Sequence, residues 1–443
     1  MSQDPPCPVP LPCCGTYSVH VLGCKVNQVE ARQIEQFLSH AGLHPCPKRD
    51  IPDVLVVHTC AVTAEAEVQS AQTLRRVRAG APHAHLILSG CGAARLLSFV
   101  PADTVIPSGP EWADAWFRTL SLSPEAVPRA TLSATDPILR QFGGRVRAFL
   151  KIQDGCDLNC SYCIVPSLRG PSRDRPVSKI IEEAKSLIAD GCRELVVTGV
   201  SAGLYGRHNG GTTLSELLRR LANLPDLERL RLSSLHPAEL TLDILNVWQE
   251  MREKIMPHVH LPLQSGSDRI LKRMRRGYTV KSYREAVDRV RKVLPEPEFN
   301  TDLIAGFPGE TDEDAKKSEE MCRQIGFSRI HVFPYSVRPN TDAASLPDPV
   351  PVALARKRAR QLRDLASQLA LRSHHREVGR TVRVYVESQN AKTLFLAGYT
   401  ERYLPVQFPG PTNWIGSTRV IRILEADSKQ LRGHPAEVEA SNP

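Results

Sequence analysis

Three cysteines lie close together near the middle of the chain. Cys156, Cys160 and Cys163 are spaced four and three residues apart, in a loop that directly follows an apolar, strand-like run over 146–152. A structural zinc ion takes four ligands, whereas this loop supplies three thiols. Thiolates at this density bind iron–sulfur clusters, and a set of three leaves one iron free to bind a small molecule. A zinc knuckle with a remote fourth ligand, or an ordinary loop, is the alternative.

Three further cysteines each come at the end of a predicted strand. Cys24, Cys60 and Cys91 close short apolar runs, and helical patterns at about 29–41 and 64–79 follow the first two runs. Alternation of strands and helices predicts a parallel sheet, in which the carboxyl ends of all strands lie at one edge. We therefore expect these three thiols to converge on a second site. Three buried structural cysteines are the alternative, because cysteine is among the most buried residue types.

The whole chain reads as an α/β protein of three parts. Residues 15–125 predict an N-terminal parallel α/β domain, and a linker rich in Ser, Pro, Ala and Thr follows at 120–143. Residues 142–373 contain six strand–helix units, too few for an eight-stranded barrel but suited to a partial (β/α)6 barrel with its site at the strand C-termini. Residues 376–437 predict a small C-terminal β-barrel. The six expected central strands are 146–151, 194–199, 229–233, 258–262, 299–304 and 329–334.

Composition narrows the environment and the partners. The 443 residues carry a formal charge of +9, a basic excess that is compatible with a polyanionic partner. No apolar run reaches the ~18 residues needed to span a bilayer, and the Pro-rich start is not a signal peptide, so we expect a cytoplasmic protein with no membrane partner. In a reducing cytoplasm cysteines act more often as metal ligands than as disulfides. Cys46, Cys192 and Cys322 lack partners at ligand spacing, and we interpret them as incidental; Cys7, Cys13 and Cys14 lie in the Pro-rich start, which we expect to be disordered.

Basic and aromatic residues suggest an RNA partner. The C-terminal segment combines an excess of basic residues with interleaved aromatics, which is how small barrels hold single-stranded RNA. Aromatics that fill the core of the barrel itself are the alternative. Basic runs at 269–276 and within the predicted helix 352–375 are further candidates for phosphate contacts, or else solvated faces.

Several runs of the sequence resemble a known family. The Cys156–Cys163 spacing, with Tyr162 before the last cysteine, matches the motif of the radical S-adenosylmethionine (SAM) superfamily. Runs that resemble the methylthiotransferases within it are 23–28, 150–170, 260–274 and 301–314. The resemblance covers about 17–425 and includes a terminal RNA-binding barrel of the TRAM type. The runs 23–28 and 331–336 are most similar to the branch that modifies N6-threonylcarbamoyladenosine beside the tRNA anticodon.

The resemblance implies two [4Fe-4S] clusters. Cys156, Cys160 and Cys163 would hold the cluster that binds SAM and cleaves it to a 5′-deoxyadenosyl radical. An auxiliary cluster would carry or deliver sulfur from the second triplet, Cys24, Cys60 and Cys91. A second SAM would supply the methyl group, giving a methylthio group at C2 of the adenosine at position 37. The terminal barrel would present the anticodon loop of the tRNA, and an electron donor such as flavodoxin or ferredoxin would reduce the cluster.

The contacts to SAM and the choice of substrate are less constrained. Ser233, Gln264 and Gly306 are expected to contact SAM, from their places at predicted strand ends. His58, Gly92 and Ala94 stand where the family usually has Asn, an aromatic residue and Gln. These departures lie near the sulfur-donating site. The alternatives are methylthiolation of isopentenyladenosine in tRNA or of a ribosomal protein, and a non-catalytic, metal-containing RNA-binding protein.

Overall fold

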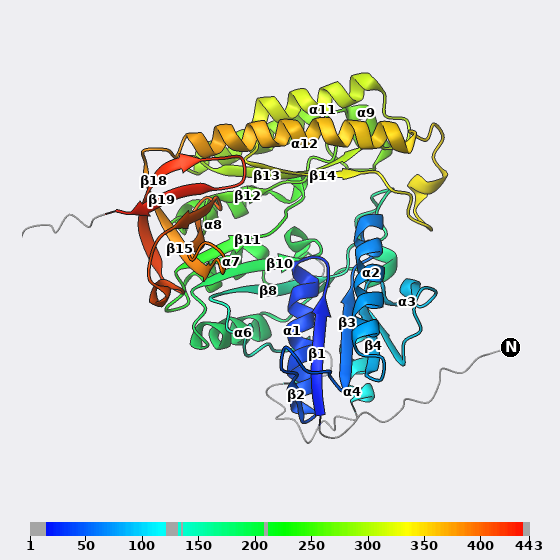
Figure 1. Ribbon diagram of the computed structural model, residues 1–443. Coiled ribbons are helices and arrows are strands. Elements are labelled where there is room, and N and C mark those ends of the chain that lie inside the picture. The colour runs from blue at the N-terminus through cyan, green and yellow to red at the C-terminus, as the bar shows by residue number, and fades with distance from the viewer. Residues whose placement is uncertain (1–14, 121–131, 134–135, 208–210, 437–443) are drawn as a thin grey trace, which may run out of the picture.

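The computed structural model describes residues 15–120, 132–133, 136–207 and 211–436 (Figure 1). Within these ranges no helix combines the length and apolar character needed to cross a bilayer. Cys7, Cys13 and Cys14 fall outside these residues, as does most of the predicted linker. The end of that linker packs against the central part, because Ile138, Leu139 and Phe142 are buried in its core.

The N-terminal part is a three-layer α/β unit. Its elements are β1 (Gly15–Val21), α1 (Lys25–His40), β2 (Leu43–Pro45), β3 (Val54–Thr59), α2 (Ala64–Gly80), β4 (His85–Gly90), α3 (Ala93–Leu96), β5 (Thr104–Pro107) and α4 (Trp112–Thr119). The parallel sheet has the order β2-β1-β3-β4-β5. Alternate residues of β3 pack on opposite faces, Val54 and Val56 with α1 and α4, and Leu55 and Val57 with α2 and α3. Burial on both faces explains the continuous apolar run of this strand.

The central part is a partial barrel of six parallel strands, as predicted. Its strands are β8 (Arg147–Asp154), β10 (Glu194–Gly199), β11 (Arg229–Leu232), β12 (His258–His260), β13 (Glu298–Ala305) and β14 (Arg329–Pro334). They form two sheets, ordered β11-β10-β8 and β12-β13-β14, and the short antiparallel β9 (Arg173–Asp174) extends the first of them. The helices are α5 (Val165–Arg169), α6 (Val177–Ala189), α7 (Leu214–Ala222), α8 (Leu242–Glu250), α9 (Asp268–Arg273), α10 (Val280–Val293), α11 (Asp312–Ile325) and α12 (Val352–His375).

Short elements complete these two parts. A two-stranded ribbon precedes the central strands, formed by β6 (Leu132–Ser133) and β7 (Asp136–Pro137). Turns of 3-10 helix are η1 (Ala202–Leu204), η2 (Pro237–Glu239), η3 (Asp342–Ser345) and η4 (Thr412–Trp414). The sequence patterns did not predict α5 or α9, because both are short helices inside loops rather than periodic segments.

The C-terminal part is a closed five-stranded barrel. Its strands are β15 (Thr381–Gln389), β16 (Leu396–Thr400), β17 (Pro405–Phe408), β18 (Thr418–Ala426) and β19 (Leu431–Pro435), ordered β15-β16-β17-β19-β18. It lies at the N-terminal ends of the central strands, away from the N-terminal part (Figure 1). At this junction Arg229 donates to the carbonyl of Tyr399 at 3.0 Å, and Tyr385 donates to the carbonyl of Val146 at 2.7 Å. The barrel therefore closes the end of the central barrel that is opposite the cysteine loop.

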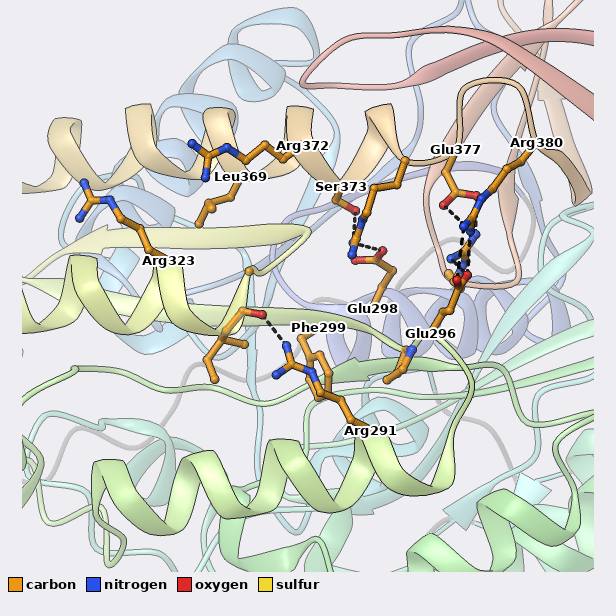
Figure 2. A pocket seen from close by; sticks show the side chains of 15 residues that line it. Arg291, Glu296, Glu298, Phe299, Arg323, Leu369, Arg372, Ser373, Glu377 and Arg380 are labelled. Atoms are coloured by element: carbon orange, nitrogen blue, oxygen red, sulfur yellow. Dashed lines mark hydrogen bonds and ion pairs between the residues drawn. The ribbon is translucent and has the colours of Figure 1, made fainter.

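Ion pairs join the C-terminal barrel and α12 to the start of β13 (Figure 2). Arg376 pairs with Glu298 at 2.8 Å, and Arg380 pairs with Glu296 at 2.8 Å. Arg402 reaches Glu296 at 2.9 Å. Carboxylates of the chain itself neutralise these arginines, so the pocket that they line holds the C-terminal barrel against the central part rather than binding RNA.

The aromatics of the barrel divide between its core and its junction. Tyr385 and Phe408 are fully buried. Tyr399 and Tyr403 stack on each other, 4.6 Å between centroids, and Arg147 of the central part lies over both rings. These four aromatic side chains pack against other parts of the protein, whereas Phe395 and Trp414 keep exposed surface.

Candidate active site

The first cysteine triplet occupies the loop after β8, at the C-terminal edge of the central sheet. Gly155 opens this loop at a φ of +72°, and a Cβ at this position would lie 1.9 Å from the carbonyl oxygen of Pro171. Glycine is therefore required there. Cys156 N donates to the carbonyl of Gly170 at 3.1 Å, which fixes the start of the loop against its end. Gln153, fully buried, braces the same turn by donating to the carbonyl of Gly155 at 2.7 Å.

The three thiols of this loop lie within electrostatic reach of one another. Burial raises the pKa of Cys163 to about 12 and also raises the pKa of Cys156. Burial thus disfavours free thiolates, which calls for positive charge beside them. Arg276 supplies some of it, because its Nη1 donates to Cys160 Sγ at 3.1 Å. Bound iron would supply the rest, since coordination deprotonates a thiol.

The second triplet lies at the carboxyl ends of three neighbouring strands. Cys24 caps the start of α1 after β1, and Cys60 and Cys91 directly follow β3 and β4. A Cβ on Gly23 would lie 2.8 Å from the Cβ of Cys60, so the first and second strand ends are in close contact. Cys60 has Cys24 and Cys91 as electrostatic neighbours, and burial raises its pKa to about 11. The structure brings the three cysteines together; their role as ligands stays a prediction.

The two triplets offer the same set of donors. Among the residues that the structure describes, no three His, Cys, Asp or Glu side chains gather closely enough to hold one metal ion. Both sites offer three thiols, a donor set that iron–sulfur clusters take and that lacks the fourth ligand of a structural zinc site. Both also place a guanidinium against a sulfur, as an anionic cluster requires. The donor set of each triplet suits such a cluster, and a cluster at each of the two sites stays a prediction.

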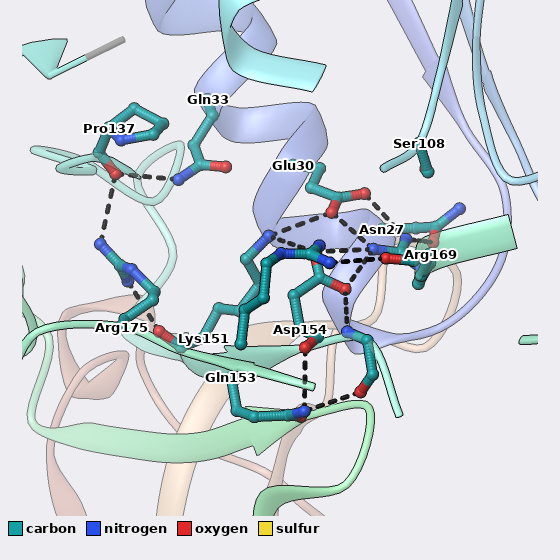
Figure 3. Close-up of polar contacts among 12 residues, drawn as sticks. Asn27, Glu30, Gln33, Ser108, Pro137, Lys151, Gln153, Asp154, Arg169 and Arg175 are labelled. Carbon is teal, nitrogen blue, oxygen red and sulfur yellow. Dashed lines mark hydrogen bonds and ion pairs between the residues drawn. The ribbon is translucent and has the colours of Figure 1, made fainter. Parts of the chain in front are cut away.

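A buried arginine, Arg169, connects the two triplets; Figure 3 shows its contacts with Asn27, Glu30 and Asp154. Arg169 lies six residues after Cys163 and is 2% exposed. Its Nε donates to Cys91 Sγ at 3.1 Å, and its Nη2 donates to Asn27 Oδ1 at 3.0 Å. Asn27 in turn lies 3.6 Å from Cys24 Sγ. The loop that carries the first triplet is thus bonded directly to the second.

Carboxylates from both parts surround Arg169. Its Nη1 donates to Glu30 of α1 at 2.8 Å and to Asp154 of β8 at 3.0 Å. Lys151 pairs with the same two acids at 3.1 Å each. Burial alone would raise the pKa of Glu30, but Arg169 and Lys151 hold it well below its ordinary value. A compact group of buried charges therefore fixes α1 against the central sheet.

His58, one of the departures from the family pattern, belongs to this group. It is fully buried, with Nε2 3.1 Å from Glu30 Oε2 and Nδ1 3.3 Å from Ser89 Oγ. Its ring also meets that of Trp112 edge-on at 6.3 Å. Sequence reasoning did not single out Glu30, Lys151, Asp154 or Arg169, because no local pattern marks an acid such as Glu30 whose basic partners lie more than a hundred residues away.

The three predicted SAM contacts occupy different settings. Ser233 follows β11, and its hydroxyl is buried without a hydrogen-bond partner among the described residues. Gln264 has a φ of +63° and pairs its backbone with Asp302 and Ile304. A free buried hydroxyl at a strand end suits a polar ligand such as SAM, so the role of Ser233 and Gln264 remains a prediction consistent with their positions.

Gly306 has a structural reason to be glycine. A Cβ there would lie 2.3 Å from the Cβ of Ala355, so its bare Cα allows α12 to pack on the end of β13. Its amide donates to Glu310 Oε2 at 2.8 Å. The expected SAM contact at Gly306 is neither supported nor contradicted by this packing.

An acid and a histidine that the sequence did not reveal lie beside the cysteine loop. Glu239 accepts from Ser201 Oγ at 2.9 Å and from His236 N at 2.9 Å, and it is an electrostatic neighbour of Cys156. Burial raises the pKa of Glu239 and lowers that of His236 to about 4. His236 Nε2 bonds to the carbonyl of Arg276 at 3.0 Å, which as an acceptor selects the tautomer protonated at Nε2. This pair holds the Arg276 segment against the loop.

Family models cover all three parts of the chain. Residues 150–322 match the radical SAM superfamily, 16–102 match the family described as Uncharacterized protein family UPF0004, and 375–436 match the TRAM domain. The chain is 32% identical to the Bacillus subtilis threonylcarbamoyladenosine tRNA methylthiotransferase MtaB, over 93% of this chain and 94% of that protein. The chain belongs to the radical SAM methylthiotransferase family. Membership implies SAM and a [4Fe-4S] cluster, and it excludes the non-catalytic alternative.

Relatives that are named for a different tRNA nucleoside are about as similar to this chain. A tRNA-2-methylthio-N(6)-dimethylallyladenosine synthase of Cutibacterium acnes is 35% identical, over 83% of this chain and 78% of that one. Among solved structures, the radical SAM methyltransferase TsrM of Kitasatospora setae, with tryptophan and a SAM analogue bound, gives a TM-score of 0.53 at 14% identity. It covers 74% of each chain and supports the fold alone. Identity by itself does not choose between the two adenosine substrates.

Proposed function

We propose that this protein adds a methylthio group to C2 of N6-threonylcarbamoyladenosine at position 37 of tRNA. The observation that carries the proposal is the meeting of two cysteine triplets through Arg169, whose Nε lies 3.1 Å from Cys91 Sγ. Two sites this close allow a radical made at one to act on a nucleotide that receives sulfur at the other. Relatives from Bacillus subtilis and Thermotoga maritima, both named threonylcarbamoyladenosine tRNA methylthiotransferase, match this chain over 94% of their own length at 32% identity, which supports this substrate.

Two clusters fit the two triplets. Cys156, Cys160 and Cys163 would hold the [4Fe-4S] cluster of radical SAM chemistry, and a second [4Fe-4S] cluster would be held by Cys24, Cys60 and Cys91. When bound, the first supplies reductive cleavage of SAM and the second supplies a site for sulfur. The guanidinium groups of Arg276 and Arg169 each donate a hydrogen bond to one cysteine sulfur and balance negative charge there.

The remaining residues would position the ligands. Ser233, Gln264 and Gly306 would contact SAM at the ends of β11, β12 and β13. The C-terminal barrel would hold the anticodon loop with the surface that does not face the central part. A small electron-transfer protein such as flavodoxin or ferredoxin would act as reductant, and the reaction would take place in the cytoplasm, where tRNA is found.

Nucleosides from tRNA of strains with and without the gene test the substrate. Mass spectrometry should show that 2-methylthio-N6-threonylcarbamoyladenosine disappears in the deletion strain and returns when the gene is restored. If only the methylthio derivative of isopentenyladenosine were lost, the dimethylallyl substrate would be correct. Unchanged tRNA nucleosides would refute the proposal altogether.

Iron analysis tests the second cluster separately. After anaerobic reconstitution we expect about eight irons per chain in the wild type, and about four after Cys156, Cys160 and Cys163 are all replaced by alanine. The variant with Cys24, Cys60 and Cys91 replaced is the matched control and should also keep about four. A triple variant of the loop that retains no iron would show that the second site does not bind a cluster.

A further inference from the structure

Polar side chains line the inner face of the second half of the central barrel. On β12, β13 and β14 the residues Val259, Leu303 and Val332 are part of the hydrophobic core beneath the helices. Side chains alternate along a strand, so their neighbours face the other way, into the interior of the barrel. We name this group the interior cluster; it consists of His260, Asp302, Arg329 and His331, joined by Lys25 from α1.

The aspartate of the interior cluster already has a hydrogen-bond partner. Asp302 lies 3.1 Å from His260 Nε2. The ring of His260 stacks on that of His331, with 6.0 Å between centroids. Ser234 Oγ lies 3.2 Å from the other nitrogen of His260. One aspartate is thus engaged by one histidine and flanked by another.

The two cations of the cluster have no such partner. Lys25 directly follows Cys24, is half-buried, and has Asp302, Arg147 and Arg329 as electrostatic neighbours. Among the described residues, neither Lys25 nor Arg329 has a carboxylate within ion-pair distance, and neither side chain makes a hydrogen bond. A half-buried lysine and an exposed arginine therefore lie within electrostatic reach of each other, and the lysine directly follows one of the predicted cluster ligands.

The chemistry of the substrate supplies the missing anion. The threonylcarbamoyl group on N6 ends in a free carboxylate, whereas the dimethylallyl group is uncharged and apolar. A carboxylate pairs well with Lys and Arg through charge-assisted hydrogen bonds. An apolar group in the same place would leave the half-buried ammonium of Lys25 without a partner, which a site built for hydrogen bonding rejects strongly.

We propose that Lys25, together with Arg329, binds the carboxylate of the threonylcarbamoyl side chain and selects this nucleoside over uncharged N6 derivatives. The inference rests on the proposed function, because it needs the modified adenine to lie between the two cysteine triplets. A phosphate of the RNA backbone is the other anion that could reach this place. A contact with the threonylcarbamoyl carboxylate requires the modified nucleoside, whereas a contact with a backbone phosphate does not.

Binding to three anticodon stem-loop RNAs distinguishes them. The RNAs are identical except at position 37, which carries threonylcarbamoyladenosine, its neutral methyl amide, or unmodified adenosine. Fluorescence anisotropy is measured under anaerobic conditions with the reconstituted enzyme and SAM. Wild type should bind the carboxylate RNA at least about tenfold more tightly than the amide RNA, the size expected of hydrogen bonds to a charged group.

Lys25→Gln should reduce that preference to about threefold or less, with unchanged affinity for the amide RNA, and Lys25→Arg should retain most of it. Lys357→Gln, which removes an exposed cation on α12, is the matched control and should keep the wild-type preference. Arg329 is exposed, so Arg329→Gln gives the same test if Lys25→Gln fails to fold.

Two results overturn the inference. One is a wild type that binds carboxylate and amide RNAs equally. The other is a Lys25→Gln variant that weakens all three RNAs by the same factor, which assigns Lys25 to the backbone. A single-turnover assay on the carboxylate RNA distinguishes failure of the carboxylate contact from failure of the proposed function. No methylthio product from wild type refutes the function, whereas product with a preference independent of Lys25 refutes only the carboxylate contact.

Discussion

Replacing Arg169 with methionine should release α1 from the central part. Arg169 is the common partner of Glu30 and Asp154, and Met has a similar length without the charge. Removing one member of a buried ion pair costs about 3–5 kcal/mol, because the remaining charge is left without its partner. Lys151 stays 3.1 Å from both acids, so we expect the lower end, about 3 kcal/mol.

Hydrogen exchange measures this cost where it arises. A loss of about 3 kcal/mol in the free energy of local opening corresponds to about a 100-fold faster exchange of the protected amides of α1 (Lys25–His40). Peptides from α7 (Leu214–Ala222), on the far side of the central sheet, serve as the internal reference and should not change. The comparison is made on apo-protein, so that cluster loading does not contribute.

The matched control removes an arginine of similar size from the surface. Arg219 pairs with Glu250 at 2.8 Å, but both side chains are more than 40% exposed, and such pairs contribute little. Arg219→Met should leave the exchange of α1 unchanged. If Arg169→Met accelerated exchange in α1 by less than about threefold, the buried charges would not be what holds the two parts together.

Two further perturbations follow from the cysteine loop. Gly155→Ala should prevent the loop from closing, because the added Cβ would lie 1.9 Å from Pro171 O. Iron per chain should then fall by about half. The control Gly211→Ala, where the added Cβ meets open space, should leave the iron content unchanged. Burial lowers the pKa of His236 in the folded protein to about 4, against an ordinary value of 6.5. As the pH falls from 6.5 toward 4, the unfolded chain therefore takes up a proton at this histidine before the folded one does. The free energy of unfolding decreases over the same range. His236→Asn should reduce that loss, measured as the shift of the urea midpoint of the apo-protein between these pH values; an identical shift in both proteins would contradict it.

Local patterns predicted most of the architecture. All six central strands lie where the apolar runs placed them, because buried strands of a parallel sheet are continuous apolar segments. The same reasoning located Cys24, Cys60 and Cys91 at neighbouring strand ends, far apart in sequence. The edge strands β2 and β5 were missed, since strands of three and four residues carry too few alternations to stand out.

Aromatic composition was a weaker guide than strand pattern. The interleaved aromatics of the C-terminal segment suggested RNA stacking, yet Tyr385 and Phe408 fill the core, and Tyr399 and Tyr403 pack under Arg147. An aromatic residue has the same type whether it meets a base, a core or a neighbouring domain. Which of these it meets depends on how the domains dock.

The sequence by itself determined the chemistry: the spacing of Cys156, Cys160 and Cys163 is local, and the second triplet follows from the rule that parallel strands end at one edge. Only the tertiary structure decided how the two sites are joined. Arg169 and Glu30 are separated by 139 positions, and no periodicity or motif links a buried acid to a distant buried base. Burial makes their pairing obligatory, because each charge is costly in the interior without the other.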